Sequence, residues 1–60
     1  MPLVTVKMLE GRTLEQKRAM VEKVTQAIVE TTGATPESVT IDIQHIAKDD
    51  IAVAGKLLGE

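Results

Sequence analysis

Hydrophobic and polar positions alternate along two short stretches of the chain, and this period of two is typical of β-strands. Residues 2–8 place Val4, Val6 and Met8 on one face and Leu3, Thr5 and Lys7 on the other. Residues 39–46 place Val39, Ile41 and Ile43 on one face and Thr40, Asp42 and Gln44 on the other. Many of these residues are β-branched, which favours a strand in both stretches.

Between the two strands the hydrophobic period becomes that of a helix. Thr13 and Gln16 have the spacing of a capping box, which predicts that a helix begins at Leu14. The helical pattern continues to about Thr32, and Gly33 is placed to end it. We expect its apolar stripe to consist of Leu14, Val21, Val24, Ala27 and Ile28.

The remaining segments are short connections. Residues 34–38 suit a single helical turn with Pro36 in its first position. Residues 47–50 form a polar break, and residues 51–58, which contain Gly55, suit a short strand or hairpin. The expected fold class is therefore α/β, a single domain over residues 1–60. It is one βαβ unit with parallel strands, a right-handed crossover and a short C-terminal strand or hairpin.

The length of the chain makes an isolated core marginal. A domain of sixty residues buries only about 60% of the surface that its unfolded chain exposes. The chain has no cysteine and a single histidine, which leaves oligomerisation as the remaining means of stabilisation. One helix covers one face of a two-stranded sheet, so we expect the other face to be apolar and to meet another copy of the chain.

Composition excludes several classes of function. The net charge is −2 and there is no Phe, Tyr or Trp, so nucleic acid is not an expected partner. No apolar run approaches the length of a membrane span, and no signal-peptide pattern opens the sequence. We therefore expect a cytoplasmic protein that does not enter a membrane.

Pro2 is the first candidate for chemistry. From its position alone, it is more simply explained as a residue that starts a strand, where its missing N–H costs nothing. If Met1 is removed, however, Pro2 carries a free secondary amine. An α-amine has a reference pKa of roughly 7.7–8.0, and burial or a nearby cation lowers it further, which suits a general base.

Arg12 is the second candidate, although an exposed arginine in a turn is slightly more probable from position alone. Its guanidinium can bind a substrate carboxylate through two hydrogen bonds. Eight residues of strand at about 3.3 Å each would separate Pro2 from Arg12 by roughly 26 Å within one chain. They can meet only if an antiparallel second subunit brings its Arg12 to the Pro2 of the first, which a two-fold dimer does twice.

Other polar residues carry weaker signals. His45 ends the face that begins at Val39 and has a side chain suited to acid–base chemistry, but an ordinary strand-end histidine is the simpler interpretation. Asp49 and Asp50 are typical of a turn, and Asp42 alone does not make a cation site. We expect the three methionines to fill apolar space.

The segment MPLVTVKMLEGRTLEQKRAMVEKVTQAIVETTGA resembles the 4-oxalocrotonate tautomerase family, also called 2-hydroxymuconate tautomerases. The resemblance continues more loosely to AVAGKLL and covers nearly the whole chain. It implies the βαβ fold, commonly assembled as a hexamer that is a trimer of dimers. It also implies that Pro2 is a general base that moves a proton between carbon and oxygen, or between two carbons, of an unsaturated keto acid, with Arg12 as the carboxylate binder. No cofactor or metal is implied.

Two positions depart from the family pattern. Thr40 stands where many members carry a second arginine, and Ile51 stands where many carry an aromatic residue. Ile51 can keep a substrate pocket dry, whereas Thr40 supplies no charge, and Lys48 is a possible substitute. We therefore expect substrate-binding roles for Arg12, Ile51 and Thr40, and chemistry at Pro2.

The resulting hypothesis is a keto–enol tautomerase acting on a small 2-hydroxy-dienoate or related acid. One alternative is a hydratase or decarboxylase reaction at the same proline. Another is a non-catalytic oligomer of the same fold. All catalytic versions require that Met1 be removed, because an attached Met1 makes the Pro2 nitrogen an amide.

Overall fold

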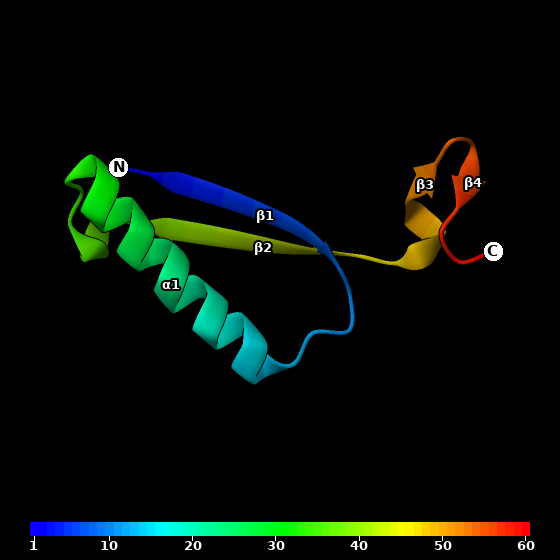
Figure 1. The fold of residues 1–60 in the computed structure, drawn as a ribbon, viewed down its shortest axis with the longest axis horizontal. Coiled ribbons are helices and arrows are strands. Elements are labelled where there is room, and N and C mark those ends of the chain that lie inside the picture. Colours follow the sequence, from blue (N-terminus) through cyan, green and yellow to red (C-terminus); the bar gives the residue numbers. More distant parts are fainter.

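The computed structural model describes all of residues 1–60, and it has the expected order of strand, helix, strand and hairpin (Figure 1). The elements are β1 (Leu3–Leu9), α1 (Leu14–Thr32), β2 (Thr40–Ile46), β3 (Ala52–Val53) and β4 (Lys56–Leu57). Short 3₁₀ turns at Pro36–Ser38 and Lys48–Asp50 connect them. The α/β fold class is therefore confirmed, including the C-terminal hairpin.

The sheet at the centre of the unit has two strands. β1 and β2 are parallel, with Leu3 opposite Thr40 and Leu9 opposite Ile46. The ladder continues one step past β1, because the backbone N–H of Glu10 donates to the carbonyl of Ile46 at 3.1 Å. The chain therefore leaves the sheet in a fixed direction before it turns into the helix.

Both ends of α1 are fixed by the residues that the sequence indicates. The Thr13 hydroxyl accepts a hydrogen bond from the Gln16 backbone at 3.1 Å, and the Gln16 side chain accepts one from the Thr13 backbone at 2.9 Å. Gly33 closes the helix in the left-handed conformation, with φ of 78°, and its N–H donates to Val29. No helix in the chain has the length and hydrophobicity required to cross a membrane.

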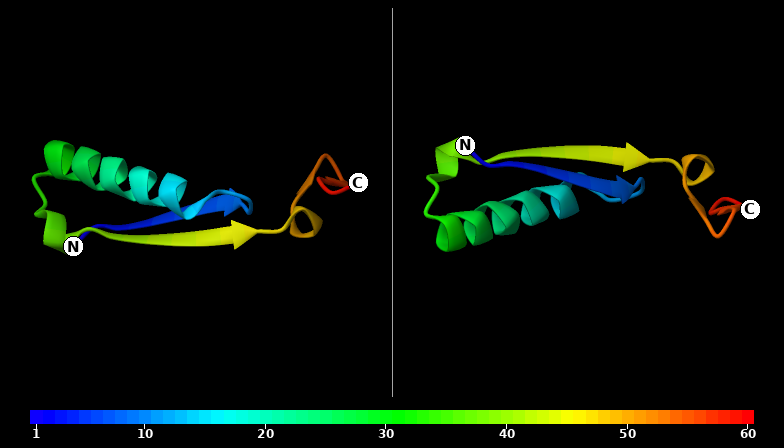
Figure 2. Two further views of the ribbon diagram at one scale, coloured as in Figure 1. Left: turned by 90° about the horizontal axis from the view of Figure 1, so that it is seen from below. Right: turned by 90° about the horizontal axis from the view of Figure 1, so that it is seen from above.

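α1 lies across one face of the sheet (Figure 2). The strand side chains that point toward it are half-buried: Val4, Val6, Met8, Ile41 and Ile43. Val21, Val24 and Ile28 of the expected helical stripe are also half-buried. The other two are exposed, Leu14 by 66%, because Leu14 and Ala27 lie at the margins of the stripe.

The opposite face of the sheet is bare (Figure 2). We expected this face to be apolar, and that expectation is wrong. Its exposed side chains are Leu3, Thr5, Lys7, Thr40, Asp42 and Gln44, of which only Leu3 is apolar. The strand alternation that turns valine and isoleucine toward α1 also turns these polar residues away from it. Apolar burial by a second copy must therefore involve other surfaces.

The single chain has no interior. None of its sixty residues is fully buried, and its exposed surface of 4681 Å² exceeds the roughly 3,800 Å² typical of a folded monomer of this mass. The radius of gyration is 14.5 Å, against about 10 Å for a compact domain of this length. The chain is thus more extended, and exposes more surface, than a compact monomer of its length.

Residues 47–60, which we call the arm, extend beyond the end of β2 and away from α1 (Figures 1 and 2). Ala54 and Gly55 both have positive φ, 53° and 81°, as a two-residue type I′ hairpin requires. The Leu58 N–H donates back to the Ile51 carbonyl at 3.0 Å and closes the segment on itself. The arm is thus locally ordered but projects from the βαβ unit.

Candidate functional site

Pro2 lies at the N-terminal end of the sheet. It is half-buried, and its carbonyl accepts a hydrogen bond from the Thr40 backbone at 3.0 Å. This bond holds Pro2 and Thr40 side by side, at the starts of the two parallel strands. Met1 precedes them and is 94% exposed. With Met1 attached, the Pro2 nitrogen is a tertiary amide without basicity, whereas its removal would leave a secondary amine in the same place.

Arg12 lies at the other end of β1. It is exposed in the turn before α1, where Gly11 adopts φ of 117° and Thr13 caps the helix. Its side chain lines a groove of about 250 Å³ with Met8, Gln16, Lys17 and Met20. An arginine with a partly apolar groove beside it is suited to binding a small organic carboxylate.

The predicted site residues are separated within one chain. Pro2 and Thr40 lie where the strands begin, whereas Arg12 and Ile51 follow the points where the strands end (Figure 1). Ile51 is half-buried at the start of the arm. The seven residues of β1, at about 3.3 Å each, separate the two ends by roughly 23 Å. A single chain therefore does not bring these four residues together.

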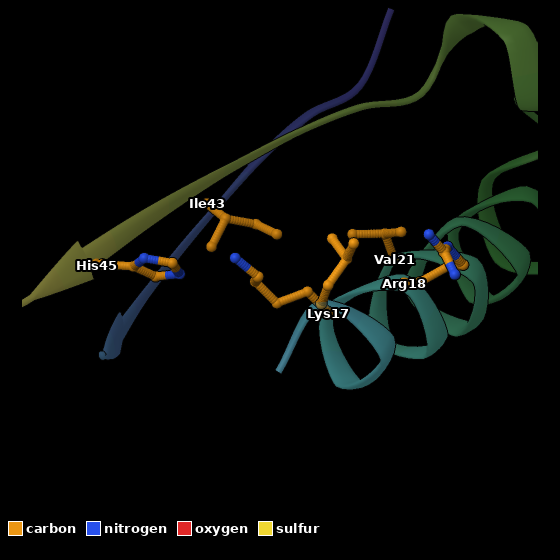
Figure 3. Close-up of a pocket in the computed structure, with 6 residues that line it drawn as sticks. Lys17, Arg18, Val21, Ile43 and His45 are labelled. Carbon is orange, nitrogen blue, oxygen red and sulfur yellow. The ribbon is translucent and has the colours of Figure 1, made fainter. Parts of the chain in front are cut away.

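A second and larger groove lies between α1 and β2 (Figure 3), and sequence reasoning did not find it. Its volume is about 410 Å³, and its lining residues are Leu14, Lys17, Arg18, Val21, Ile43 and His45. His45 lies on the helix side of the strand, as its alternation with Ile43 predicts. The signal in the sequence was the helical spacing of residues 14, 17, 18 and 21.

The acidic candidates do not form a site. Asp42 accepts a hydrogen bond from the Gln44 amide at 2.9 Å on the bare face of the sheet, whereas Asp49 and Asp50 lie in the 3₁₀ turn that follows β2. No three His, Asp or Glu side chains gather closely enough to hold a metal ion.

Comparison with known proteins places the chain in context. Residues 2–60 match the family model described as tautomerase enzyme. A 2-hydroxymuconate tautomerase from Bacillus subtilis strain 168 is 62% identical over 60 residues, which are all of this chain and 97% of that protein.

Solved structures agree with this result. The crystal structure of YwhB, a homologue of 4-oxalocrotonate tautomerase, matches with a TM-score of 0.95 and 61% identity over 98% of this chain and 97% of that one. A heterohexamer 4-oxalocrotonate tautomerase from Chloroflexus aurantiacus matches with a TM-score of 0.93 and 28% identity, over 100% of this chain and 97% of that one.

Proposed function

The chain belongs to the tautomerase family and is an enzyme of the tautomerase type, and from this premise we propose that it interconverts keto and enol forms of a small 2-hydroxy-dienoate or a related unsaturated keto acid. The family match supports the class of reaction. The proposed substrate rests on the names of the relatives and on the arginine groove, which suits a small organic carboxylate.

We assign the proton transfer to Pro2 after removal of Met1. The neutral secondary amine takes the hydroxyl proton of the enol, and the resulting ammonium returns a proton to a carbon of the conjugated chain. The amine thus acts first as base and then as acid, and no net charge accumulates. The placement of Pro2 supports this role, because the hydrogen bond from the Thr40 N–H to the Pro2 carbonyl holds the residue at a strand end.

Arg12 of the partner subunit would complete the site. If two copies pair through the free edges of β1 in antiparallel orientation, the Pro2 end of each strand lies beside the Arg12 end of the other. One such dimer contains two equivalent sites, and three dimers make the hexamer that we propose. The guanidinium would bind the substrate carboxylate, and its charge would lower the pKa of the Pro2 amine below that of a free α-amine.

Thr40 and Ile51 are the proposed residues that shape specificity. Thr40 adjoins Pro2 in the same chain and offers a hydroxyl but no charge. Ile51 would form an apolar wall beside Arg12. The site then binds one carboxylate strongly, so Thr40→Arg is expected to increase kcat/KM for a dicarboxylate more than for a monocarboxylate. Equal effects on both substrates would show that Thr40 does not lie in the substrate site.

The observation that carries the proposal is a family match that begins at Pro2, the residue whose amine excision of Met1 would free. The test is to produce the protein with Met1 retained, by inhibiting methionine aminopeptidase, and to treat half of it with the purified aminopeptidase. Mass spectrometry reports removal of Met1, and ultraviolet absorbance follows ketonisation of 2-hydroxymuconate. Activity should appear only after Met1 is removed, while circular dichroism and oligomer mass stay constant. Full activity of the Met1 form would overturn the role of Pro2.

The shared site has its own test. Pro2→Ala and Arg12→Ala chains should each be weakly active as homo-oligomers, the second mainly through a raised KM. Loss of a charged hydrogen-bonding partner typically costs about 1.5–3 kcal/mol, or roughly 10- to 150-fold. When the two variants are unfolded, mixed and refolded together, some sites regain both residues and activity should return. Mixed oligomers that stay inactive would show that Pro2 and Arg12 do not act across subunits.

The pH dependence provides a further check on the base. The limb of kcat/KM that rises with pH should have its midpoint below the reference α-amine pKa of about 7.7, because a nearby guanidinium favours the neutral amine. Arg12→Ala should move that midpoint upward. If the midpoint does not change in Arg12→Ala, the titrating group does not interact with the arginine.

A further inference from the structure

Lys17 departs from the pattern of the helix that carries it. It stands four residues before Val21 and seven before Val24, so the helical period places it in line with the half-buried stripe of α1. It is half-buried, whereas every other lysine, arginine, aspartate and glutamate of the chain is exposed. An apolar side chain would serve packing better at this position, and such departures from local rules concentrate at functional sites.

No carboxylate of the chain lies in the grooves that Lys17 lines. Its side chain borders both of them, and neither has an aspartate or glutamate among its lining residues. In Figure 3 it reaches from α1 toward Ile43 and His45 of β2. Its ammonium takes part in none of the side-chain hydrogen bonds of the chain. A half-buried cation in such surroundings is suited to an anion from outside the chain.

The smaller groove, of about 250 Å³, places Lys17 beside Arg12. Gln16 also lines it, and the side-chain oxygen of Gln16 already accepts the Thr13 N–H at 2.9 Å, so its amide NH₂ is the group that remains to donate. Two methionine side chains complete the lining with apolar, polarisable surface. The free polar groups of this groove are therefore donors and cations, which suits a carboxylate attached to a hydrocarbon chain.

Thr40 supplies no charge to the proposed site, and Lys17 is better placed than Lys48 to supply one. Lys48 lies in the 3₁₀ turn after β2, is exposed and is absent from the lining of both grooves, whereas Lys17 shares a groove with Arg12. We propose that Lys17 is the second cation of the carboxylate site, and that its ammonium holds the same substrate carboxylate as the Arg12 guanidinium. This inference rests on the tautomerase reaction and the role of Arg12 proposed above.

The two cations differ in what they contribute. Arginine presents a planar fork that fixes the orientation of a carboxylate, whereas lysine adds a compact point charge. A carboxylate has about four lone-pair sites on its two oxygens, so it can accept from both groups at once. Because Lys17 is half-buried, water screens its charge less than that of an exposed lysine. Lys17 therefore contributes to binding and orienting the substrate, and the proton transfer stays with Pro2.

Lys17→Met removes the charge and keeps an unbranched side chain that suits the apolar stripe. With 2-hydroxymuconate and enzyme from which Met1 has been removed, KM should rise about tenfold or more while kcat changes by less than about threefold. Lys17→Arg keeps the charge and should restore most of the affinity. Lys23→Met removes the same charge from the exposed side of α1 and should change KM by less than about twofold. Equal effects of Lys17→Met and Lys23→Met on KM would overturn the proposal.

Binding of a carboxylate that does not react separates this inference from the proposed reaction. The probe is sorbate, a conjugated six-carbon monocarboxylate without a hydroxyl group, and isothermal titration calorimetry gives its Kd. Arg12→Ala and Lys17→Met should each raise that Kd about tenfold. A raised Kd in Arg12→Ala alone would overturn the role of Lys17 and leave the reaction standing. A raised Kd in both variants, with no tautomerase activity in the unmodified enzyme, would overturn the proposed reaction and support the two-cation site.

The double variant Arg12→Ala/Lys17→Met tests whether both cations hold one carboxylate. Its rise in the Kd of sorbate should differ from the product of the two single rises by about twofold or more, because groups that share a partner are coupled. Simple multiplication of the two effects would place the cations at independent positions and overturn the proposal. Sedimentation on dilution checks the structural alternative. A smaller oligomer in Lys17→Met with an unchanged Kd for sorbate would assign the ammonium to a carboxylate of another copy, which also overturns the proposal.

Discussion

The βαβ unit and the arm differ in what holds them in shape. In the βαβ unit, α1 and the parallel strands share an apolar layer, and side chains such as Val6, Ile41 and Ile43 are half-buried within it. In the arm, only Ala47 and Ile51 are partly covered, and order comes from a tight turn and local hydrogen bonds. The first region is an incomplete core, and the second is a preformed segment with no core at all.

The difference shows how a chain of sixty residues can adopt a defined conformation although it buries little of its own surface. Local rules such as caps, turns and alternation determine the conformation of both regions. Burial, which provides most of the stability of folded proteins, is small within the single chain. Substitutions in the two regions should therefore act differently, and each of the following predictions probes that difference.

The largest effect is expected in the apolar layer. Ile41→Ala should lower the free energy of unfolding by about 1–3 kcal/mol, at or below the lower part of the range for a fully buried isoleucine, because Ile41 is half-buried. Urea denaturation followed by circular dichroism at a fixed protein concentration measures it. Glu22→Ala, on the exposed face of α1, should change the same quantity by less than about 0.5 kcal/mol. Equal losses would show that the layer between helix and sheet does not carry the stability of the unit.

A matched pair of glycines compares the two regions directly. Gly33 and Gly55 have nearly the same φ, 78° and 81°, and an added Cβ would meet nothing within 4 Å at either position. Alanine at each therefore carries a similar conformational cost of about 1–2 kcal/mol. Gly33→Ala should lower the stability of the whole βαβ unit by that amount.

Gly55→Ala should instead loosen the arm. Hydrogen exchange is expected to speed up in residues 52–58, with little change in β1 and β2. If Gly55→Ala lowered exchange protection throughout the chain as Gly33→Ala does, the two regions would form one cooperative unit.

The helix cap should give a smaller loss. Thr13→Ala removes the hydroxyl that accepts from the Gln16 backbone and should cost about 1 kcal/mol of stability. Thr13→Ser keeps the hydroxyl and should recover most of it. Since Arg12 directly precedes this cap, loosening it should also raise KM for the carboxylate substrate. Unchanged thermal stability of Thr13→Ala would mean that packing alone fixes the start of α1.

The smallest expected effect is a gain in stability from a substitution in the arm. Ala54 has φ of 53°, a conformation that glycine and asparagine adopt more readily than alanine. Ala54→Asn should stabilise the assembled protein by less than about 1 kcal/mol and slow hydrogen exchange within the hairpin. Lys56→Asn, beside the turn, is the control and should not do so. A loss of stability in Ala54→Asn would indicate that the methyl group of Ala54 is buried against another subunit.

The sequence predicts the parts of the fold that follow local rules. The Thr13–Gln16 box, the Gly33 stop and the turn at Pro36 all lie where spacing placed them. The hairpin was expected from Gly55, although the positive φ of Ala54 has no signal in its side chain. Alternation also predicted which strand faces point toward the helix. The same alternation also places polar residues on the bare face. The expectation of an apolar face followed from the general need of parallel strands for cover, and the residues of this face do not match it.

The candidate site was less accessible to sequence reasoning. Pro2 and Arg12 were identifiable from their chemistry, and the length of β1 predicted that one chain keeps them apart. The hydrogen bond between Pro2 and Thr40 depends on the register of two strands that lie far apart in sequence, which no local pattern determines. The groove around Lys17 and His45 depends on how α1 crosses the sheet, and crossing geometry is a property of packing.

The separation of Pro2 and Arg12 along β1 also bears on how genes for such chains can diverge if the proposed shared site holds. If a gene is duplicated, one copy can lose Arg12 and the other Pro2 while both keep the same backbone. Dimers of two identical chains would then be inactive, but the mixed dimer would retain one intact site. Mutations that inactivate either product alone would be tolerated as long as both are expressed together. If Pro2 is the base and Arg12 the anion binder, a seven-residue strand that keeps them apart is enough to make two gene copies dependent on each other.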